Sequence, residues 1–86
     1  MPTISYFLGI VIQMHWKDHA PPHFHALYAE HEAAYNIQEL SLLSGSLPKR
    51  AHAFVLEWAA LHQQELMDNW TLCRSNQTPR SIIPLE

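Results

Sequence analysis

The spacing of apolar residues changes once along this chain, at the Ser-Gly-Ser-Leu-Pro turn of residues 44–48. Before this turn, apolar and polar residues alternate, which is typical of strands with one buried face. After it, apolar residues recur every three or four positions, which is typical of an amphipathic helix. The sequence therefore predicts an α+β fold, in which a small antiparallel sheet packs against one long C-terminal helix.

The sheet is expected to occupy residues 4–43 as a meander of three or four strands. The predicted strands are residues 4–16, with an interruption near Gly9, then 23–29, 33–38 and the short segment 40–43. Residues 17–22 are predicted to form a loop, because Pro21 and Pro22 cannot donate backbone hydrogen bonds to a sheet.

The helix is expected over residues 48–75, with Ser46 or Leu47 as its N-cap and Pro48 in its first turn. A bend is placed near His62. The tail, residues 76–86, is apolar enough to dock as a short strand or to lie on a partner. With only 86 residues, the chain has room for one core, so residues 1–86 are interpreted as a single domain.

The composition limits the classes of function. Eight acidic against five basic side chains argue against strong non-specific binding to nucleic acid. The single cysteine, Cys73, cannot form an internal disulfide and fits a reducing compartment. The apolar opening lacks the features of a signal peptide, and no apolar run reaches the roughly 20 residues that cross a bilayer. A soluble, cytoplasmic protein with no membrane partner is expected, and its low charged fraction suggests a surface covered by a partner or by a second copy.

The densest chemical signal is a group of ionisable side chains around the proline loop: His15, Asp18, His19, His23 and His25. If residues 23–29 form a strand, the two-residue period places the rings of His23 and His25 on one face. The two prolines stiffen the backbone that delivers them. We therefore expect the two imidazoles to converge on one site.

Three interpretations of this group remain open. In the first, His23 and His25 act as general acid and base, as metal-free cleavage of RNA requires, with Asp18 or His19 orienting them and with no cofactor. In the second, His23 and His25 bind a divalent metal ion together with His15, His19 or Asp18. In the third, the residues cap a strand and have only a structural role.

Lys49 and Arg50 form a second candidate site, in the first turn of the predicted helix. Cations are unfavourable there because the helix dipole is already positive, and no acidic side chain three or four residues away offsets them. Such a helix start can receive a phosphate or an acidic partner. The alternative is two solvated surface side chains.

The chain resembles a family of small bacterial proteins, the domain of unknown function four-one-six-zero. The resemblance rests on Met1–Ser5, Gly9–Ile12, Asp18–Ala26, Gly45–Arg50, Glu57-Trp58 and Asn69-Trp70. Members are typically encoded beside a second small protein, in pairs regarded as type II toxin–antitoxin modules with this family as the toxin. The motif positions of the family fall on Asp18, His19, Pro21, Pro22, His23, His25, Lys49 and Arg50.

The resemblance implies a toxin with a cognate antitoxin protein as its partner. The leading hypothesis is a toxin that cleaves RNA with His23 and His25, while Lys49 and Arg50 hold phosphate. One alternative is a non-catalytic module that binds its partner or regulates their gene pair. The other is a protein that binds a divalent metal through His23, His25 and His15.

Overall fold

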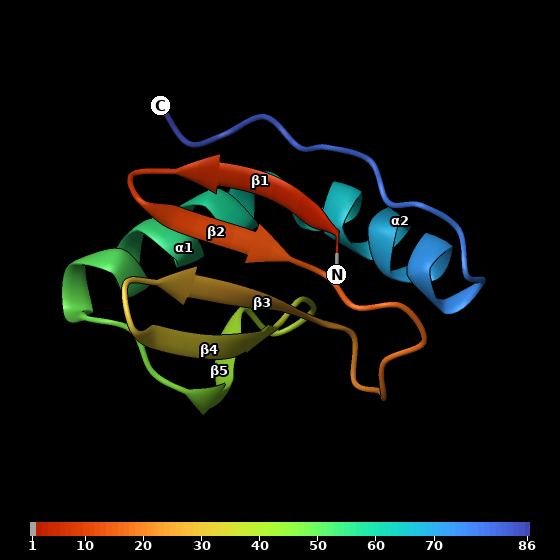
Figure 1. The fold of residues 1–86 in the computed structure, drawn as a ribbon, viewed down its shortest axis with the longest axis horizontal. Helices are drawn as coiled ribbons and strands as arrows, with labels where there is room; N and C mark the ends of the chain where they lie inside the picture. Colours follow the sequence, from red (N-terminus) through yellow and green to blue (C-terminus); the bar gives the residue numbers. More distant parts are fainter. Residues whose placement is uncertain (1) are drawn as a thin grey trace.

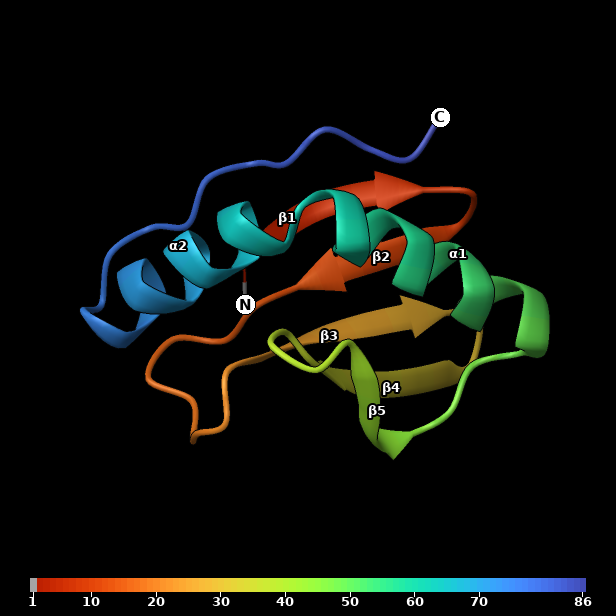
Figure 2. The same cartoon turned by 180° about the vertical axis from the view of Figure 1, so that it is seen from behind.

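The fold is a single antiparallel sheet with two helices on one of its faces (Figures 1 and 2). It is described by a computed structural model over residues 2–86, and Met1 lies outside the described part. The elements are β1 (Thr3–Phe7), β2 (Ile10–Gln13), β3 (His23–Tyr28), β4 (His31–Asn36), β5 (Ser41–Gly45), α1 (Lys49–Leu61) and α2 (Gln63–Arg74). The strands follow one another in the order β1-β2-β3-β4-β5, which confirms the predicted meander.

The sheet has five strands rather than the three or four expected. The difference lies in the predicted strand 4–16, which folds back on itself as the β1–β2 hairpin. Its two-residue loop, Leu8-Gly9, has φ angles of 52° and 81°, and Phe7 pairs directly with Ile10. Two positive φ angles suit the twist of a tight hairpin, so the chain reverses where only an interruption was expected.

The C-terminal segment contains two helices, so the expectation of one long helix was wrong. The break falls at His62, where a bend was placed, and its φ of −123° departs from helical geometry. The N–H of His62 still donates to the carbonyls of Trp58 and Ala59, and its ring contacts the carboxylate of Glu65 at 2.6 Å. The first helix begins at Lys49 with Pro48 as its N-cap, one or two residues later than predicted. Within residues 2–86, neither helix is long and apolar enough to cross a membrane.

The core lies between the sheet and the helices and is built around Trp58 of α1. Its side chain is fully buried and packs against the rings of Phe7 and Phe24, whose centroids lie at 5.3 and 5.9 Å. The indole N–H donates to the carbonyl of Ile83, so burial leaves no polar atom of the ring unpaired. One aromatic residue thus joins the two layers and the C-terminal tail.

The tail runs along the free side of β1 (Figures 1 and 2). The N–H of Ile82 donates to the carbonyl of Ile4 at 2.7 Å, and the Ser5 hydroxyl donates to the carbonyl of Ile82. Asn69 of α2 holds the backbone of Arg80 through two hydrogen bonds of 2.8 Å. The tail therefore docks on its own sheet without forming a regular strand, and it covers one sheet edge while β5 forms the other.

Candidate functional site

The connection between β2 and β3, residues 14–22, is fastened to the C-terminal end of α2. The bonds are Lys17 N–H to Cys73 O at 3.2 Å, Arg74 Nη1 to Asp18 O at 2.6 Å, and Trp16 Nε1 to Gln77 O at 3.1 Å. Backbone carbonyls at a helix end lack partners within the helix, and the Cys73 carbonyl accepts the Lys17 N–H in addition to the N–H of Asn76, which follows the helix. These bonds fix the position of Asp18.

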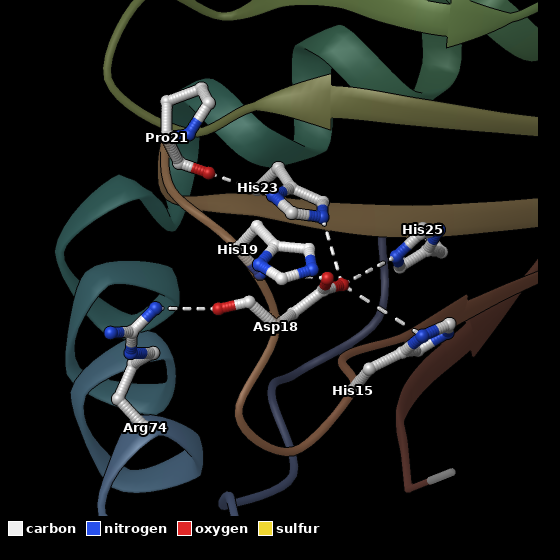
Figure 3. Close-up of polar contacts among 7 residues, drawn as sticks. All are labelled: His15, Asp18, His19, Pro21, His23, His25 and Arg74. Atoms are coloured by element: carbon white, nitrogen blue, oxygen red, sulfur yellow. Dashed lines mark hydrogen bonds and ion pairs between the residues drawn. The ribbon is translucent and has the colours of Figure 1, made fainter.

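The carboxylate of Asp18 is the centre at which the histidines meet (Figure 3). Its Oδ2 atom lies 2.9 Å from Nε2 of His23, 3.2 Å from Nε2 of His25 and 3.8 Å from Nδ1 of His15. Its Oδ1 atom accepts the backbone N–H of His19 at 2.8 Å. We call Asp18, His15, His23 and His25 the Asp18 cluster.

The three rings of the Asp18 cluster pack closely against one another. His15 and His25 are stacked, with centroids 3.8 Å apart and planes 12° apart, whereas His23 meets His25 edge-on at 5.1 Å. The other side of His23 lies against Trp70 of α2, at 5.2 Å. All four side chains are partly buried, with exposed fractions between 11% and 29%. The cluster is therefore partly shielded from solvent.

The electrostatics keep Asp18 ionised and His15 neutral. Burial by itself raises the pKa of Asp18, but hydrogen bonds from the His19 N–H and the His25 ring, with the nearby His23, outweigh it. The pKa of Asp18 is therefore below its usual value. Burial, and then the neighbouring His25, lower the pKa of His15, although Asp18 and Glu32 oppose the shift. At neutral pH the cluster thus offers a carboxylate and an uncharged imidazole.

The structure brings together three of the four residues predicted to be catalytic. His23 and His25 reach the same oxygen of Asp18, and Phe24 between them is fully buried, as the two-residue period predicts. His19 contributes its backbone N–H rather than its ring. His15, which was named only for the metal-binding interpretation, joins the group.

Sequence reasoning missed two residues of the site, Arg74 and Trp70. Arg74 donates to the carbonyl of Asp18, from which it is separated by 56 residues. Trp70 supports the ring of His23. From the sequence pattern, Arg74 was interpreted as a cation that stabilises the helix dipole and Trp70 as a core residue. No local signal connects either residue to the loop.

Lys49 and Arg50 do not join the Asp18 cluster. Arg50 lines a shallow apolar pocket together with Tyr28, and its guanidinium lies 5.6 Å from the ring centre of Phe54. Tyr28 ends β3 whereas His23 begins it, and five residue steps along a strand span about 16 Å. The predicted phosphate-binding pair therefore sits at the far end of the sheet from the histidines, and remains a separate candidate anion site.

Comparison with known proteins identifies a family. The sequence matches the family described as Domain of unknown function (DUF4160) over residues 9–71. This range includes the whole Asp18 cluster and Trp70, and it ends before Arg74. No curated protein and no solved structure matches the chain significantly.

Proposed function

The chain belongs to the DUF4160 family, and we propose that it is the toxin of a two-protein, type II toxin–antitoxin module that acts in the cytoplasm. Its proposed activity is cleavage of RNA by acid–base chemistry at the Asp18 cluster. The observation that carries this proposal is the shared contact of His23 and His25 with one carboxylate oxygen, at 2.9 and 3.2 Å. A carboxylate in this position orients imidazoles and stabilises their charged form.

The contacts of His23 and His25 assign a different role to each ring. If His25 donates its Nε2 proton to Asp18, its Nδ1 atom keeps a lone pair and acts as the base. His23 has an oxygen acceptor at each ring nitrogen, Pro21 O at 2.7 Å and Asp18 Oδ2, and a ring that donates to both is positively charged. His23 is therefore the acid.

In the proposed step, His25 takes the proton of a ribose 2′-hydroxyl. The 2′-oxygen bonds to phosphorus, the bond from phosphorus to the 5′-oxygen breaks, and His23 gives its proton to that oxygen. The products are a 2′,3′-cyclic phosphate and a free 5′-hydroxyl. Lys17 in the loop and Arg74 beside it are exposed cations, and we assign to them the phosphate contact that Lys49 and Arg50 are too distant to make.

The test is induction of the chain in a bacterial host, with and without the neighbouring gene, followed by analysis of total RNA. The parent is expected to stop growth and cleave RNA, and the partner to prevent both. His25→Gln and His23→Gln should abolish both effects. His31→Gln, in β4 and outside the cluster, is the matched control and should remain toxic. Toxicity that survives both cluster substitutions would refute the catalytic proposal.

The second candidate is a non-catalytic module that binds its partner, and the open sheet edge favours it. β5 consists of Ser-Leu-Leu-Ser-Gly, without a charged residue or proline, and Leu42 and Leu43 are 41% and 44% exposed. An uncharged edge strand readily accepts a strand from another chain. We place the antitoxin there, and a second copy of this chain is the competing occupant.

Co-purification separates these occupants. The parent should bind the neighbouring protein, and Leu43→Lys should weaken that binding while the isolated chain keeps its thermal stability. If the parent alone elutes as a dimer and the variant as a monomer, β5 instead joins two copies of this chain.

A further inference from the structure

We propose that His15, Asp18 and His25, with His23 as a fourth ligand, form a binding site for one divalent transition-metal ion of the zinc type. The inference rests on the geometry of the Asp18 cluster and does not require the chain to cleave RNA. It concerns an ion that binds three imidazole nitrogens and one carboxylate oxygen, a ligand set that suits zinc and its neighbours.

Three of the four donor atoms already lie close together, and His23 contacts only the Asp18 oxygen among them. The ligand atoms of His15, Asp18 and His25 all lie within 4.8 Å of one another. In a tetrahedral site with metal–ligand distances of about 2.0–2.1 Å, neighbouring ligand atoms are about 3.3 Å apart. The three nitrogens lie 2.9, 3.2 and 3.8 Å from Asp18 Oδ2, on both sides of that value. Rotation of the rings about their side-chain bonds would bring the nitrogens onto one ion beside this oxygen.

The contacts of His23 identify the nitrogen that would bind. Its Nδ1 atom lies 2.7 Å from the carbonyl of Pro21, which can only accept a hydrogen bond, so Nδ1 carries a proton. In the neutral ring, Nε2 then directs a lone pair at the Asp18 carboxylate, 2.9 Å away. Two facing lone pairs need a positive centre between them, either a proton or a metal ion. A carbonyl that accepts the other ring N–H is the usual support of a metal-binding histidine.

The stack of His15 on His25 disfavours protonation of both rings, and metal binding would require the rings to turn, because the lone pairs of their nitrogens lie in the ring planes. His15 and His25 lie face to face at 3.8 Å, where two charged rings would repel each other. A single divalent ion would satisfy all three rings and the carboxylate. Magnesium and calcium prefer oxygen ligands and should not bind.

Metal binding would have a consequence for the proposed chemistry. The ion would occupy the Nε2 lone pair of His23 and the carboxylate that orients His25, so a metal-loaded chain could not act as an acid–base nuclease. It would also link the loop, through His15 and Asp18, to β3, through His23 and His25. The metal-loaded form is therefore expected to be more stable and inactive toward RNA.

The test uses the whole chain, expressed without a polyhistidine tag, stripped with EDTA and then titrated with zinc. One equivalent should remain after gel filtration, as measured by elemental analysis. At a hundredfold excess of free zinc over Kd, the melting temperature should rise by roughly 10–20 °C. Magnesium at the same concentration should cause no shift.

Substitution of the proposed ligands tests the site residue by residue. His15→Ala and His25→Ala should weaken zinc binding at least tenfold, whereas His31→Ala should bind like the parent. Asp18→Asn should also lose affinity for zinc, and because it preserves the shape of the side chain it is the variant least expected to misfold. Circular dichroism of each metal-free variant checks its fold. No stoichiometric zinc, or equal affinity in His15→Ala and the parent, would overturn the site. RNA cleavage measured in EDTA is a separate readout, so the nuclease proposal can fail while the metal site stands.

Discussion

Replacing Asp18 by asparagine tests whether the Asp18 cluster is held by charge. The substitution keeps the size of the side chain and allows Oδ1 to continue accepting the His19 N–H. It removes the negative charge from the atom that His23 and His25 contact at 2.9 and 3.2 Å. Any loss of stability in metal-free protein therefore reports mainly on those two charge-assisted contacts.

The expected loss follows from the burial of the site. A hydrogen bond to a charged group contributes about 1.5–3 kcal/mol. The Asp18 side chain is 21% exposed, and solvent screening reduces this value to about 1 kcal/mol for each ring. Asp18→Asn should therefore lower the free energy of unfolding by about 2 kcal/mol at pH 6, or roughly 8–16 °C in melting temperature.

The assay measures the free energy of unfolding in urea, with EDTA present, from pH 7 to pH 2.5. Its dependence on pH is the decisive observation. The folded pKa of Asp18 is lowered, so its stabilisation is present above the ordinary value of 3.8 and is lost as pH falls through the folded pKa. The parent and the variant should therefore converge in strong acid. Asp68→Asn, at an exposed carboxylate that accepts from Gln64, is the control and should cost under 0.5 kcal/mol. An equal loss at pH 6 and pH 2.5 would refute an electrostatic origin.

Three further substitutions, the last with a matched control, test His15, the core and the tail. The pKa of His15 is lowered in the folded protein, so the unfolded chain binds a proton below pH 6.5 that the folded parent excludes, and the parent loses stability as the pH falls from 7 to 5. His15→Gln should lose less stability than the parent over this range in urea unfolding. A parent and variant with parallel pH profiles would contradict this. Trp58→Ala should cost about 3–5 kcal/mol in the same assay, because this fully buried ring joins both layers and the tail; a loss below 1 kcal/mol would show that the core is not centred there. Ile82→Asp should cost about 2–4 kcal/mol by thermal melting, because it buries a charge where the tail meets β1, whereas Ile83→Asp, at a residue 68% exposed, should change little.

The order of the strands and the place of the helical segment could be predicted from the sequence, because both depend on the period of the apolar residues. The predicted segments 23–29, 33–38 and 40–43 match β3, β4 and β5 to within two residues at each end. The β1–β2 hairpin could not be predicted with the same ease. Its loop places Leu8 at positive φ, and leucine gives no turn signal, although Gly9 does.

The break between α1 and α2 is a similar case. His62 is neither proline nor glycine, so its sequence indicates at most a bend. The break is supported by contacts that the pattern of apolar residues does not report: the ring of His62 binds Glu65, and the side chain of Gln63 donates to the carbonyls of Ile37 and Gln38. Tertiary contacts thus decide whether the bend becomes a break.

In the candidate site, too, local features could be predicted from the sequence and long-range ones could not. The spacing of His23 and His25 and the nearness of Asp18 are local properties, and the predicted convergence of the two rings on one site is confirmed by their shared contact with Asp18. The position of Lys49 and Arg50 is a property of the whole fold, because it depends on where α1 starts relative to the sheet. The leading hypothesis, in which Lys49 and Arg50 hold the phosphate, requires them beside the histidines, whereas the structure places Arg50 beside Tyr28, at the opposite end of β3.

The Asp18 cluster depends on contacts that also complete α2, so the site and the helix end are coupled. The carbonyl of Cys73 accepts the Lys17 N–H, and Arg74 in the last turn donates to the Asp18 carbonyl. A helix end that frays would release the loop and move the carboxylate away from the rings of His23 and His25. A proton or a metal ion bound at the cluster should in turn hold the loop in place. The loop would then hold the end of α2 in place. Ligand binding at the cluster and order at the end of α2 must then change together, because the same loop residues serve both.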